Sequence, residues 1–359
     1  MRIEVDCERI RRNTEAVVRL CAPHDIEVVG VTKACCGHPE VACGMLAGGA
    51  SFLAESRLAN VRRLREAGID ADVMLLRLPA LSEVDEVVRL AEVSLNSQVE
   101  TVRALSRAAQ ARGVTHHVIL MVETGDRREG VMPERAVDVA RGMAGLPNLE
   151  LAGIGANVTC IGGVLPTREN AQLLVDVAGE IERALGIELR ILSAGNSATL
   201  ALILRHEMPA RANQLRIGGA ILIGEVDSTG DWPSALPHQD AFTVVAEVIE
   251  VETKPSVPEG PIAPNAFGHV PRWEDLGPRR RAILAMGRQD LQTDGLQPRR
   301  PGVTIVGASS DHLVVDVTET DPPVRLGEEL EFNPPYGAVA TAMASRTATQ
   351  VVIPMKSRE

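Results

Sequence analysis

Lysine is almost absent from this sequence. Of 359 residues, 37 are lysine or arginine, yet lysine stands only at positions 33, 254 and 356. Lys33 follows the apolar run Val28–Val31 and Thr32, and a lysine at the end of a buried strand is costly to desolvate. Parallel α/β enzymes place catalytic groups at that end of their strands. Lys33 is therefore the first candidate for a Schiff-base-forming amine, although a general preference for arginine would also explain the scarcity.

Aromatic residues, basic charge, long apolar runs and paired cysteines are scarce as well. Aromatic residues are 2% of the chain, and the net charge is -11, which argues against nucleic acid or an anionic membrane as partner. We expect a small-molecule substrate instead. No apolar run reaches about 18 residues and the N-terminus lacks a signal-peptide core, which predicts a cytoplasmic protein. Six cysteines without metal-type spacing predict free thiols and no metal site.

The first two thirds of the chain alternate short apolar runs with amphipathic stretches, the pattern of repeated βα units. The expected strands lie near 27–33, 50–54, 72–77, 92–96, 116–123, 149–157, 188–194 and 215–223. The expected helices lie near 8–21, 39–48, 57–67, 82–90, 98–111, 133–144, 167–184 and 197–205. Eight strands with interleaved helices and one leading helix predict an α/β fold of the (β/α)8 TIM-barrel type.

After residue 225 the pattern changes. The turn-forming residues Asp227–Pro233 are followed by short strand-like runs and no convincing long helix. The strand candidates are Val244–Val251, Ala282–Met286, Thr304–Gly307, Leu313–Val317 and Glu329–Phe332. We therefore expect two domains, a barrel at 1–230 and a C-terminal all-β domain at 236–359.

Three segments at the carboxyl ends of barrel strands carry candidate chemistry. Ser193–Thr199 opens a helix with small, donor-rich residues that suit a phosphate, or form an ordinary helix cap. Arg216–Gly219 places a guanidinium before two glycines, where the backbone can approach a ligand closely. Met121–Gly130 ends a strand with a dense charge cluster, which would otherwise be a solvated loop.

These segments, in this order, resemble the alanine racemase-like, fold type III family of pyridoxal phosphate enzymes over nearly the whole chain. Within that family the likeness is greatest to the branch containing ornithine racemases. The motifs that carry it are Gly30–Lys33, Leu75–Pro79, Gly125–Gly130, Gly153–Asn157, Gly195–Ser197, Leu215–Gly218, Gly287–Asp290 and Gly307–Leu313.

The resemblance implies a role for each matching residue. Lys33 would form the internal aldimine with the cofactor, Arg216 would face the pyridine nitrogen, and Arg128 would reach the phenolic oxygen. Asn157 replaces a histidine that lies against the ring in alanine racemases. Ser197, with Asn196, the Ser193 turn and the amides of Gly218 and Gly219, would hold the phosphate. Tyr336, the single tyrosine, falls near the phosphate and the substrate entrance, or is a half-buried surface residue.

The sequence departs from the family at the second acid/base. Alanine racemases use a tyrosine from the partner subunit's β-domain, and the stretch Met286–Asp290 has none. Asp311, His312 and Asp290 are the candidates that remain, although His312 would also suit a structural bond to Asp311. A tyrosine near the family's lysine is also missing, since Gly37 or His38 stands there. Cys35 and Cys36 are expected to be packing residues.

The implied activity is amino-acid racemisation through an external aldimine, with pyridoxal 5′-phosphate as cofactor. The branch favours ornithine or another basic amino acid, although lysine, arginine, serine and alanine stay open. A homodimer with shared active sites is implied. The alternatives are a lyase like D-threonine aldolase, which needs a metal, and a non-catalytic pyridoxal phosphate carrier. The lyase is disfavoured because His312 has no metal-ligating companion around Tyr336.

Overall fold

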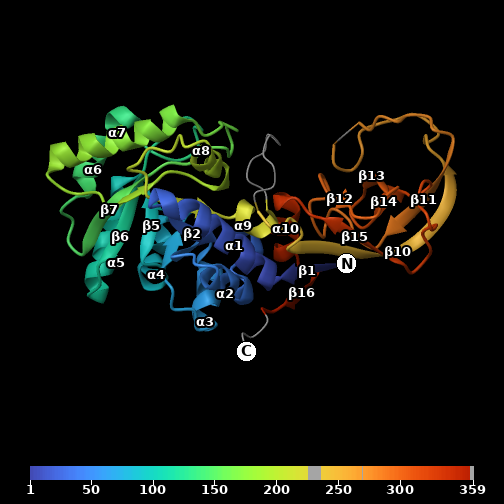
Figure 1. The fold of residues 1–359 in the computed structure, drawn as a ribbon, viewed down its shortest axis with the longest axis horizontal. Helices are drawn as coiled ribbons and strands as arrows, with labels where there is room; N and C mark the ends of the chain where they lie inside the picture. The colour runs from blue at the N-terminus through green and yellow to red at the C-terminus, as the bar shows by residue number, and fades with distance from the viewer. Residues whose placement is uncertain (225–235, 269, 356–359) are drawn as a thin grey trace. The chain divides into compact units, whose positions relative to one another are not determined.

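The computed structural model describes residues 1–224, 236–268 and 270–355, and these form two compact units (Figure 1). The larger unit contains Cys7–Gln239, and the smaller contains Met1–Asp6 with Asp240–Ile353. The predicted turn at Asp227–Pro233 lies outside the described residues.

The first strand departs from the predicted division of the chain. Sequence analysis placed residues 1–230 together, but β1 (Arg2–Asp6) pairs antiparallel with β10 (Phe242–Pro255) and parallel with β16 (Thr349–Ile353). The first six residues therefore belong to the smaller unit. Their short alternating pattern, with Ile3 and Val5 buried, satisfies a strand in either unit, so the sequence alone does not assign them.

The larger unit is a closed barrel of eight parallel strands, as predicted. Its strands are β2 (Glu27–Val31), β3 (Phe52–Glu55), β4 (Val73–Leu75), β5 (Val93–Asn96), β6 (His116–Met121), β7 (Leu149–Gly155), β8 (Ile191–Ser193) and β9 (Gln214–Ile217). The barrel closes where β2 pairs with β9. Its interior is filled by Val, Leu, Ile, Ala and Met side chains, including Val29, Met74 and Ile119. Aliphatic side chains supply this part of the core.

Helices surround the barrel strands (Figure 1). They are α1 (Cys7–Cys21), α2 (Pro39–Ala47), α3 (Leu58–Glu66), α4 (Val84–Leu90), α5 (Val99–Arg112), α6 (Ala136–Met143), α7 (Arg168–Leu185), α8 (Leu200–Leu204) and α9 (Gly219–Ile223). The prediction of one strand over 215–223 is wrong in its second half, because the chain turns at Gly218 into α9. Residues 220–223 are buried, so α9 lacks the polar face that marks a surface helix in sequence.

The smaller unit is built around a sheet of eight strands. Besides β1, β10 and β16 it contains β11 (Pro278–Leu284), β12 (Gln297–Pro298), β13 (Thr304–Ala308), β14 (Leu313–Asp316) and β15 (Glu329–Asn333). The long strand β10 pairs with β1 and β15 through its first half and with β11 through its second half. The predicted β-domain is thus confirmed in outline, with strands β12 and β16 added.

One helix interrupts the predicted all-β character of this unit. Helix α10 (Tyr336–Ala344) has the sequence Tyr-Gly-Ala-Val-Ala-Thr-Ala-Met-Ala and begins after Pro335. Alanine has the highest helix propensity, and proline favours a helix start, so this helix has a local cause. Its many small side chains give a weak amphipathic pattern, which is why the sequence showed no convincing helix there.

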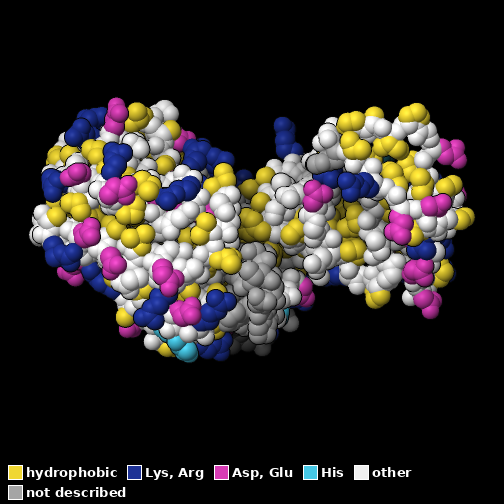
Figure 2. All heavy atoms as spheres, turned by 90° about the horizontal axis from the view of Figure 1, so that it is seen from above, with side chains coloured by type: hydrophobic (Ala, Val, Ile, Leu, Met, Phe, Trp, Pro, Cys, Tyr) yellow, Lys and Arg dark blue, Asp and Glu magenta, His cyan; other side chains and the backbone are white. Residues whose placement is uncertain are grey.

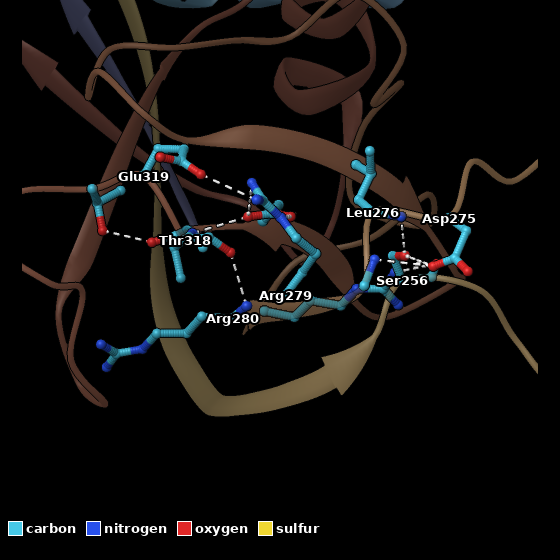
Figure 3. A network of polar contacts seen from close by, with 12 residues as sticks. Ser256, Asp275, Leu276, Arg279, Arg280, Thr318 and Glu319 are labelled. Carbon is cyan, nitrogen blue, oxygen red and sulfur yellow. Dashed lines mark hydrogen bonds and ion pairs between the residues drawn. The ribbon is translucent and has the colours of Figure 1, made fainter.

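Polar contacts link the residues around the start of β11 to the end of β10 and to the end of β14 (Figure 3). Arg279 on β11 donates from Nε to Asp316 at 2.7 Å and pairs with Glu319 at 3.1 Å. The hydroxyl of Ser256 accepts a hydrogen bond from the Leu276 N–H at 2.7 Å. These contacts lie near the first residues of β11 and the last of β14, at the opposite end of these strands from the turn that joins β13 to β14.

A substitution at Gly153 on β7 tests how closely β7 and β8 pack in the barrel. A Cβ at this position would lie 1.9 Å from the Ile191 carbonyl oxygen of β8, so Gly153→Ala forces two strands apart. We expect a loss of at least about 2 kcal/mol in the free energy of unfolding, measured by denaturant titration. The matched control is Gly179→Ala in α7, where only the end of the flexible Arg183 side chain lies within 4 Å. That change should stabilise by about 0.5–1 kcal/mol. Equal effects of both changes would contradict this account.

Candidate active site

Lys33 lies on the 3-10 turn Lys33–Cys35, directly after β2 at the carboxyl end of the barrel. Thr32 fixes the start of this turn, because its N–H donates to the Ala54 carbonyl oxygen on β3 at 2.9 Å. The Gly37 N–H donates back to the Thr32 carbonyl oxygen at 3.2 Å. The turn is therefore closed at both ends, and the side chain of Lys33 stays open to solvent at the barrel mouth.

Nearby protein atoms and charges lower the pKa of Lys33 below its usual value of 10.5. Desolvation is the largest cause, followed by the positive charge of Arg128, with a smaller contribution from Arg216. Cys160 and Glu55 act in the opposite direction. An amine with a lowered pKa is unprotonated more often near neutral pH, which is what a nucleophile or proton acceptor requires.

Arg216, at the middle of β9, is the best-buried cation of the site, with 4% of its surface exposed. It donates to the Ser193 carbonyl oxygen at 2.9 Å, to the Ser193 hydroxyl at 2.5 Å and to the Ala156 carbonyl oxygen at 2.6 Å. Burial lowers its pKa to about 10, so the guanidinium stays protonated near neutral pH. Ser193 is fully buried, and its hydroxyl serves Arg216 in the structure.

The turns after β8 and β9 converge on the hydroxyl of Ser197. Its Oγ accepts hydrogen bonds from the N–H of Gly218 at 3.3 Å and of Ala220 at 3.1 Å. The Ser197 hydroxyl and the Gly218–Gly219 segment, which the sequence analysis expected to hold a phosphate, therefore lie side by side, and Ala220 joins them. A hydroxyl beside backbone N–H groups at helix starts suits an anion such as phosphate.

Asn196 and Asn157 join the neighbouring loops. The side chain of Asn196 caps the following turn by accepting from the Ala198 N–H at 3.0 Å, and it donates to the Val158 carbonyl oxygen at 2.7 Å. It also donates to the Asn157 amide oxygen at 3.3 Å. Gly195 allows this arrangement, since it has φ 139° and a Cβ there would lie 2.1 Å from Thr199 Oγ1.

The loop after β6 presents Arg128. Glu123, a buried residue, accepts from the N–H groups of Gly125 at 2.6 Å and Arg128 at 3.1 Å, which folds the loop back on itself. The Arg128 guanidinium pairs with Glu129 and donates to the Cys160 sulfur at 3.0 Å. Desolvation is the largest single cause and acts to lower the pKa of Arg128, but the contacts with Glu129 and Cys160 together outweigh it and the pKa is raised.

Sequence reasoning missed Glu55, Glu123 and Cys160 at the barrel mouth. Glu55 ends β3 and Glu123 follows β6, so each is an acidic residue at the carboxyl end of a barrel strand. That position was itself the available signal, because catalytic groups of such barrels come from there. No such signal marked Cys160 in the sequence. The hydrogen bond from its N–H to the Asp126 carboxylate, at 3.0 Å, fixes its position.

The three candidate proton-transfer residues lie in two adjoining loops of the smaller unit. The N–H groups of Arg288 and Gln289 donate to the carbonyl oxygens of Ser309 and Ser310, at 2.9 and 3.0 Å. Asp290 is held by two hydrogen bonds: one carboxylate oxygen accepts from the Gly287 N–H of its own loop at 2.9 Å, and the other from the hydroxyl of Thr347, between α10 and β16, at 2.6 Å.

Asp311 and His312 sit at the tip of the β13–β14 hairpin and are exposed. The Ser310 hydroxyl donates to the Asp311 carboxylate at 2.5 Å, and the Ser309 hydroxyl accepts from the His312 N–H at 3.1 Å. The alternative bond between the His312 ring and Asp311 is not among the hydrogen bonds of the described residues. Tyr336 is half-exposed at the first position of α10.

The remaining predictions concern cysteines and charge. Cys35 is fully buried, and burial raises its pKa, in keeping with a packing residue. All six cysteines are free. Within the described ranges, no group of three or more His, Cys, Asp and Glu side chains is placed to hold a metal, and no helix is long and apolar enough to span a membrane. On the face in Figure 2, acidic and basic side chains are interspersed.

A lysine at the end of β2, a buried arginine on β9 and donor-rich turns after β8 and β9 define a TIM-barrel site of the pyridoxal phosphate type. The chain belongs to the alanine racemase family, because the model of the family "Alanine racemase, N-terminal domain" matches residues 5–225. This finding confirms the family that the sequence motifs indicated.

Relatives match nearly the whole chain. The ornithine racemase of Acetoanaerobium sticklandii is 35% identical over 345 residues, covering 96% of this chain and 97% of that protein. The lysine racemase of Thermotoga maritima is 38% identical over 357 residues, covering 98% of both. An alanine racemase structure from Streptomyces lavendulae has a TM-score of 0.76 at 18% identity and covers 99% of this chain and 97% of that chain. At that identity the structural likeness shows the fold alone.

Pyridoxal 5′-phosphate, the cofactor of this family, suits the groups that the barrel presents. The cofactor needs an amine, donors for a phosphate and a partner for its ring nitrogen. Lys33 supplies an accessible amine with a lowered pKa, and Ser197 lies beside the amides of Gly218 and Ala220. Arg216 has N–H donors beyond its three bonds. The residues present therefore fit the group.

The lowered pKa of Lys33 predicts unequal lysine reactivity. In a short pulse of acetic anhydride near neutral pH, Lys33 of the cofactor-free chain should be acylated several-fold faster than Lys254, which pairs with Glu250. Peptide mass spectrometry measures both rates. Arg128→Gln removes a positive charge beside Lys33, so it should slow labelling of Lys33 and leave Lys254 unchanged. Equal rates at the two lysines in the unaltered chain would contradict the electrostatic account.

Proposed function

We propose that this protein is a pyridoxal phosphate-dependent amino-acid racemase, an isomerase that interconverts the L and D forms of ornithine or another basic amino acid. The observation that carries the proposal is the placement of Lys33. Its amine lies at the carboxyl end of β2, has a lowered pKa and is beside Arg128 and Arg216. Full-length relatives named ornithine racemase and lysine racemase support the choice of substrate class.

Different residues of the barrel would bind the cofactor and transfer the α-proton. When bound, the cofactor withdraws electrons from the α-carbon of an attached amino acid, which makes the α-hydrogen acidic. Lys33 would link the cofactor and then remove and return the α-proton on one face. Ser197, Asn196 and the amides of Gly218 and Gly219 would hold the phosphate. Arg128 would reach the phenolic oxygen, and Asn157 would lie against the ring.

Arg216 would face the ring nitrogen, and Ser193 would act through it. Because Arg216 remains protonated, it would donate a hydrogen bond to the ring nitrogen and leave that nitrogen without a proton of its own. Electron withdrawal would then be weaker than with an acidic partner, which suits a reaction that only moves a proton. Tyr336 would lie near the phosphate, as the family resemblance implies.

The second proton donor and acceptor would come from the smaller unit of a partner subunit. This part of the proposal includes a cytoplasmic homodimer with shared active sites. His312 is the preferred candidate, since its ring is exposed, an imidazole can both accept and donate a proton, and it lies next to Asp311. Asp290 is less suited, because both of its carboxylate oxygens already accept hydrogen bonds, from the Gly287 N–H and the Thr347 hydroxyl. The exposed carboxylate of Asp311 would receive the distal ammonium of a basic substrate.

A lyase is the second candidate. The D-threonine aldolase of Filomicrobium marinum has a TM-score of 0.74 at 20% identity, covering 95% of this chain and 88% of that chain. This likeness concerns the fold and does not favour one reaction. The full-length racemase relatives, at 35% and 38% identity, favour racemisation, and the second unit argues against a simple carrier.

Lys33→Ala should abolish turnover, because no other lysine lies on the barrel strands. The cofactor-loaded protein is incubated with L-ornithine, L-lysine, L-alanine and L-threonine in heavy water, and α-deuterium, optical rotation and glycine release are followed. We expect deuterium with loss of rotation for the basic amino acids, and a fall of at least about 1,000-fold in Lys33→Ala. Lys254→Ala is the control and should keep full activity. Glycine release from threonine, or turnover that survives Lys33→Ala, would overturn the proposal.

His312→Ala separates the two faces of the reaction. Without the second proton group, Lys33 still exchanges the α-hydrogen of one enantiomer, but the configuration is retained. We expect racemisation to fall at least about 100-fold while exchange of one enantiomer continues. Asp290→Asn should instead lower the free energy of unfolding by about 1 kcal/mol with a small effect on racemisation. If His312→Ala racemises normally, Asp311→Asn is the next variant to measure. The proposed homodimer is tested separately by diluting the enzyme, which should lower its activity.

A further inference from the structure

Glu55 is a buried carboxylate at the barrel mouth to which no role has been given. It ends β3, its side chain is 0% exposed, and no lysine or arginine side chain pairs with it among the described residues. Its carboxylate accepts hydrogen bonds from the N–H of Ser56 at 2.6 Å and of Arg57 at 3.3 Å. Ionised groups are costly to bury, so a buried carboxylate without an ion pair points to a functional constraint.

Thr32 connects Glu55 to the turn that carries Lys33. Its hydroxyl donates to the Glu55 carboxylate at 3.1 Å and lies 3.3 Å from the Ala54 carbonyl oxygen. Its N–H is bound to the same carbonyl oxygen at 2.9 Å. The residue before Lys33 is therefore held to β3 by its backbone and by its side chain, and the side-chain contact depends on Glu55.

Glu55 also acts on Lys33 by its charge. The groups that act on the Lys33 amine are Arg128 and Arg216, which disfavour its protonated form, and Cys160 and Glu55, which favour it. Glu129 is occupied by Arg128. Besides Lys33, the thiols of Cys35 and Cys36 are influenced by Glu55. Several donors around the carboxylate favour its ionised form, while burial opposes it and raises its pKa.

We propose that Glu55 is a positioning residue for Lys33, which anchors Thr32 and supplies a buried negative charge that balances the two arginines beside the amine. Too much positive charge would leave the amine unprotonated throughout the reaction, and it must both accept a proton and return it. This inference rests on the proposed role of Lys33, and it adds a second requirement, namely that the amine be reprotonated.

The scarcity of lysine makes the test direct. Full-length protein labelled with 13C at the lysine ε-carbon gives signals from only three residues, at positions 33, 254 and 356, and single lysine-to-arginine changes assign them. The cofactor-free chain is titrated, and the midpoint of Lys33 is compared between the unaltered protein and Glu55→Gln. Loss of the negative charge should move this midpoint down by about half a unit or more. In the cofactor-loaded enzyme, the pH at which kcat falls on the alkaline side of its pH profile should also move down.

Two further variants separate charge from general damage. Thr32→Val removes the hydroxyl and keeps the carboxylate, so kcat should fall several-fold with a smaller shift of the Lys33 midpoint. Glu92→Gln removes a carboxylate that precedes β5 and accepts from the Val73 N–H at 2.8 Å, at the other end of the strands, and it should leave the Lys33 midpoint unchanged. If Glu55→Gln does not fold, Thr32→Val still tests the anchor.

The outcomes also separate this inference from the proposed function. An unchanged Lys33 midpoint and unchanged kcat in Glu55→Gln, with racemisation that depends on Lys33, would overturn the role of Glu55 alone. A shifted midpoint in a protein that racemises nothing would support the role of Glu55 and overturn the function. Unchanged kcat in Thr32→Val would overturn the anchoring part.

Discussion

The candidate site depends on the pairing of β2 with β9, which closes the barrel. Glu27 on β2 lies opposite Gln214 on β9, and Val29 lies opposite Arg216, although these residues are far apart in the sequence. Parallel strands have their carboxyl ends at one edge, so closure brings the turn with Lys33, the buried Arg216 and the Gly218 segment to the same opening. Without this pairing Lys33 would be an ordinary exposed amine at the end of an edge strand.

The electrostatics of the opening follow from this geometry. Three cationic side chains, Lys33, Arg128 and Arg216, lie within electrostatic reach of each other, and desolvation by the surrounding protein atoms already disfavours charge on Lys33 and Arg216. Each of these three side chains makes different contacts. Arg128 is paired with Glu129, Arg216 is bound by oxygens of Ser193 and Ala156, and Lys33 has no ion pair among the described residues. The least compensated cation is therefore the one available for chemistry.

The larger elements were predictable because they follow from local patterns. All eight barrel strands appear where apolar runs occur, and α7 begins at the Thr167 capping box and ends before Gly186. The sequence predictions were wrong where the local hydrophobic pattern differs from the packing in the folded chain. Residues 219–223 read as a strand because they are apolar, but they form a buried helix, and the alanine-rich α10 lacked an amphipathic signal. Strand β1 joins the smaller unit because its partners, β10 and β16, lie hundreds of residues later.

The sequence by itself determined the barrel, the presence of a β-domain and the choice of Lys33 as the candidate reactive lysine, because strand periodicity and the order of motifs can be recognised from neighbouring residues. Only the tertiary structure decided which groups act on that lysine. Glu55 and Cys160 had no role assigned from the sequence and gain significance from hydrogen bonds with residues far along the chain, and Glu123 gains it from the bond that folds its own loop around Arg128. Burial and the spacing of charges set the pKa of an amine, and both are properties of the folded chain, which the order of residues along it does not display.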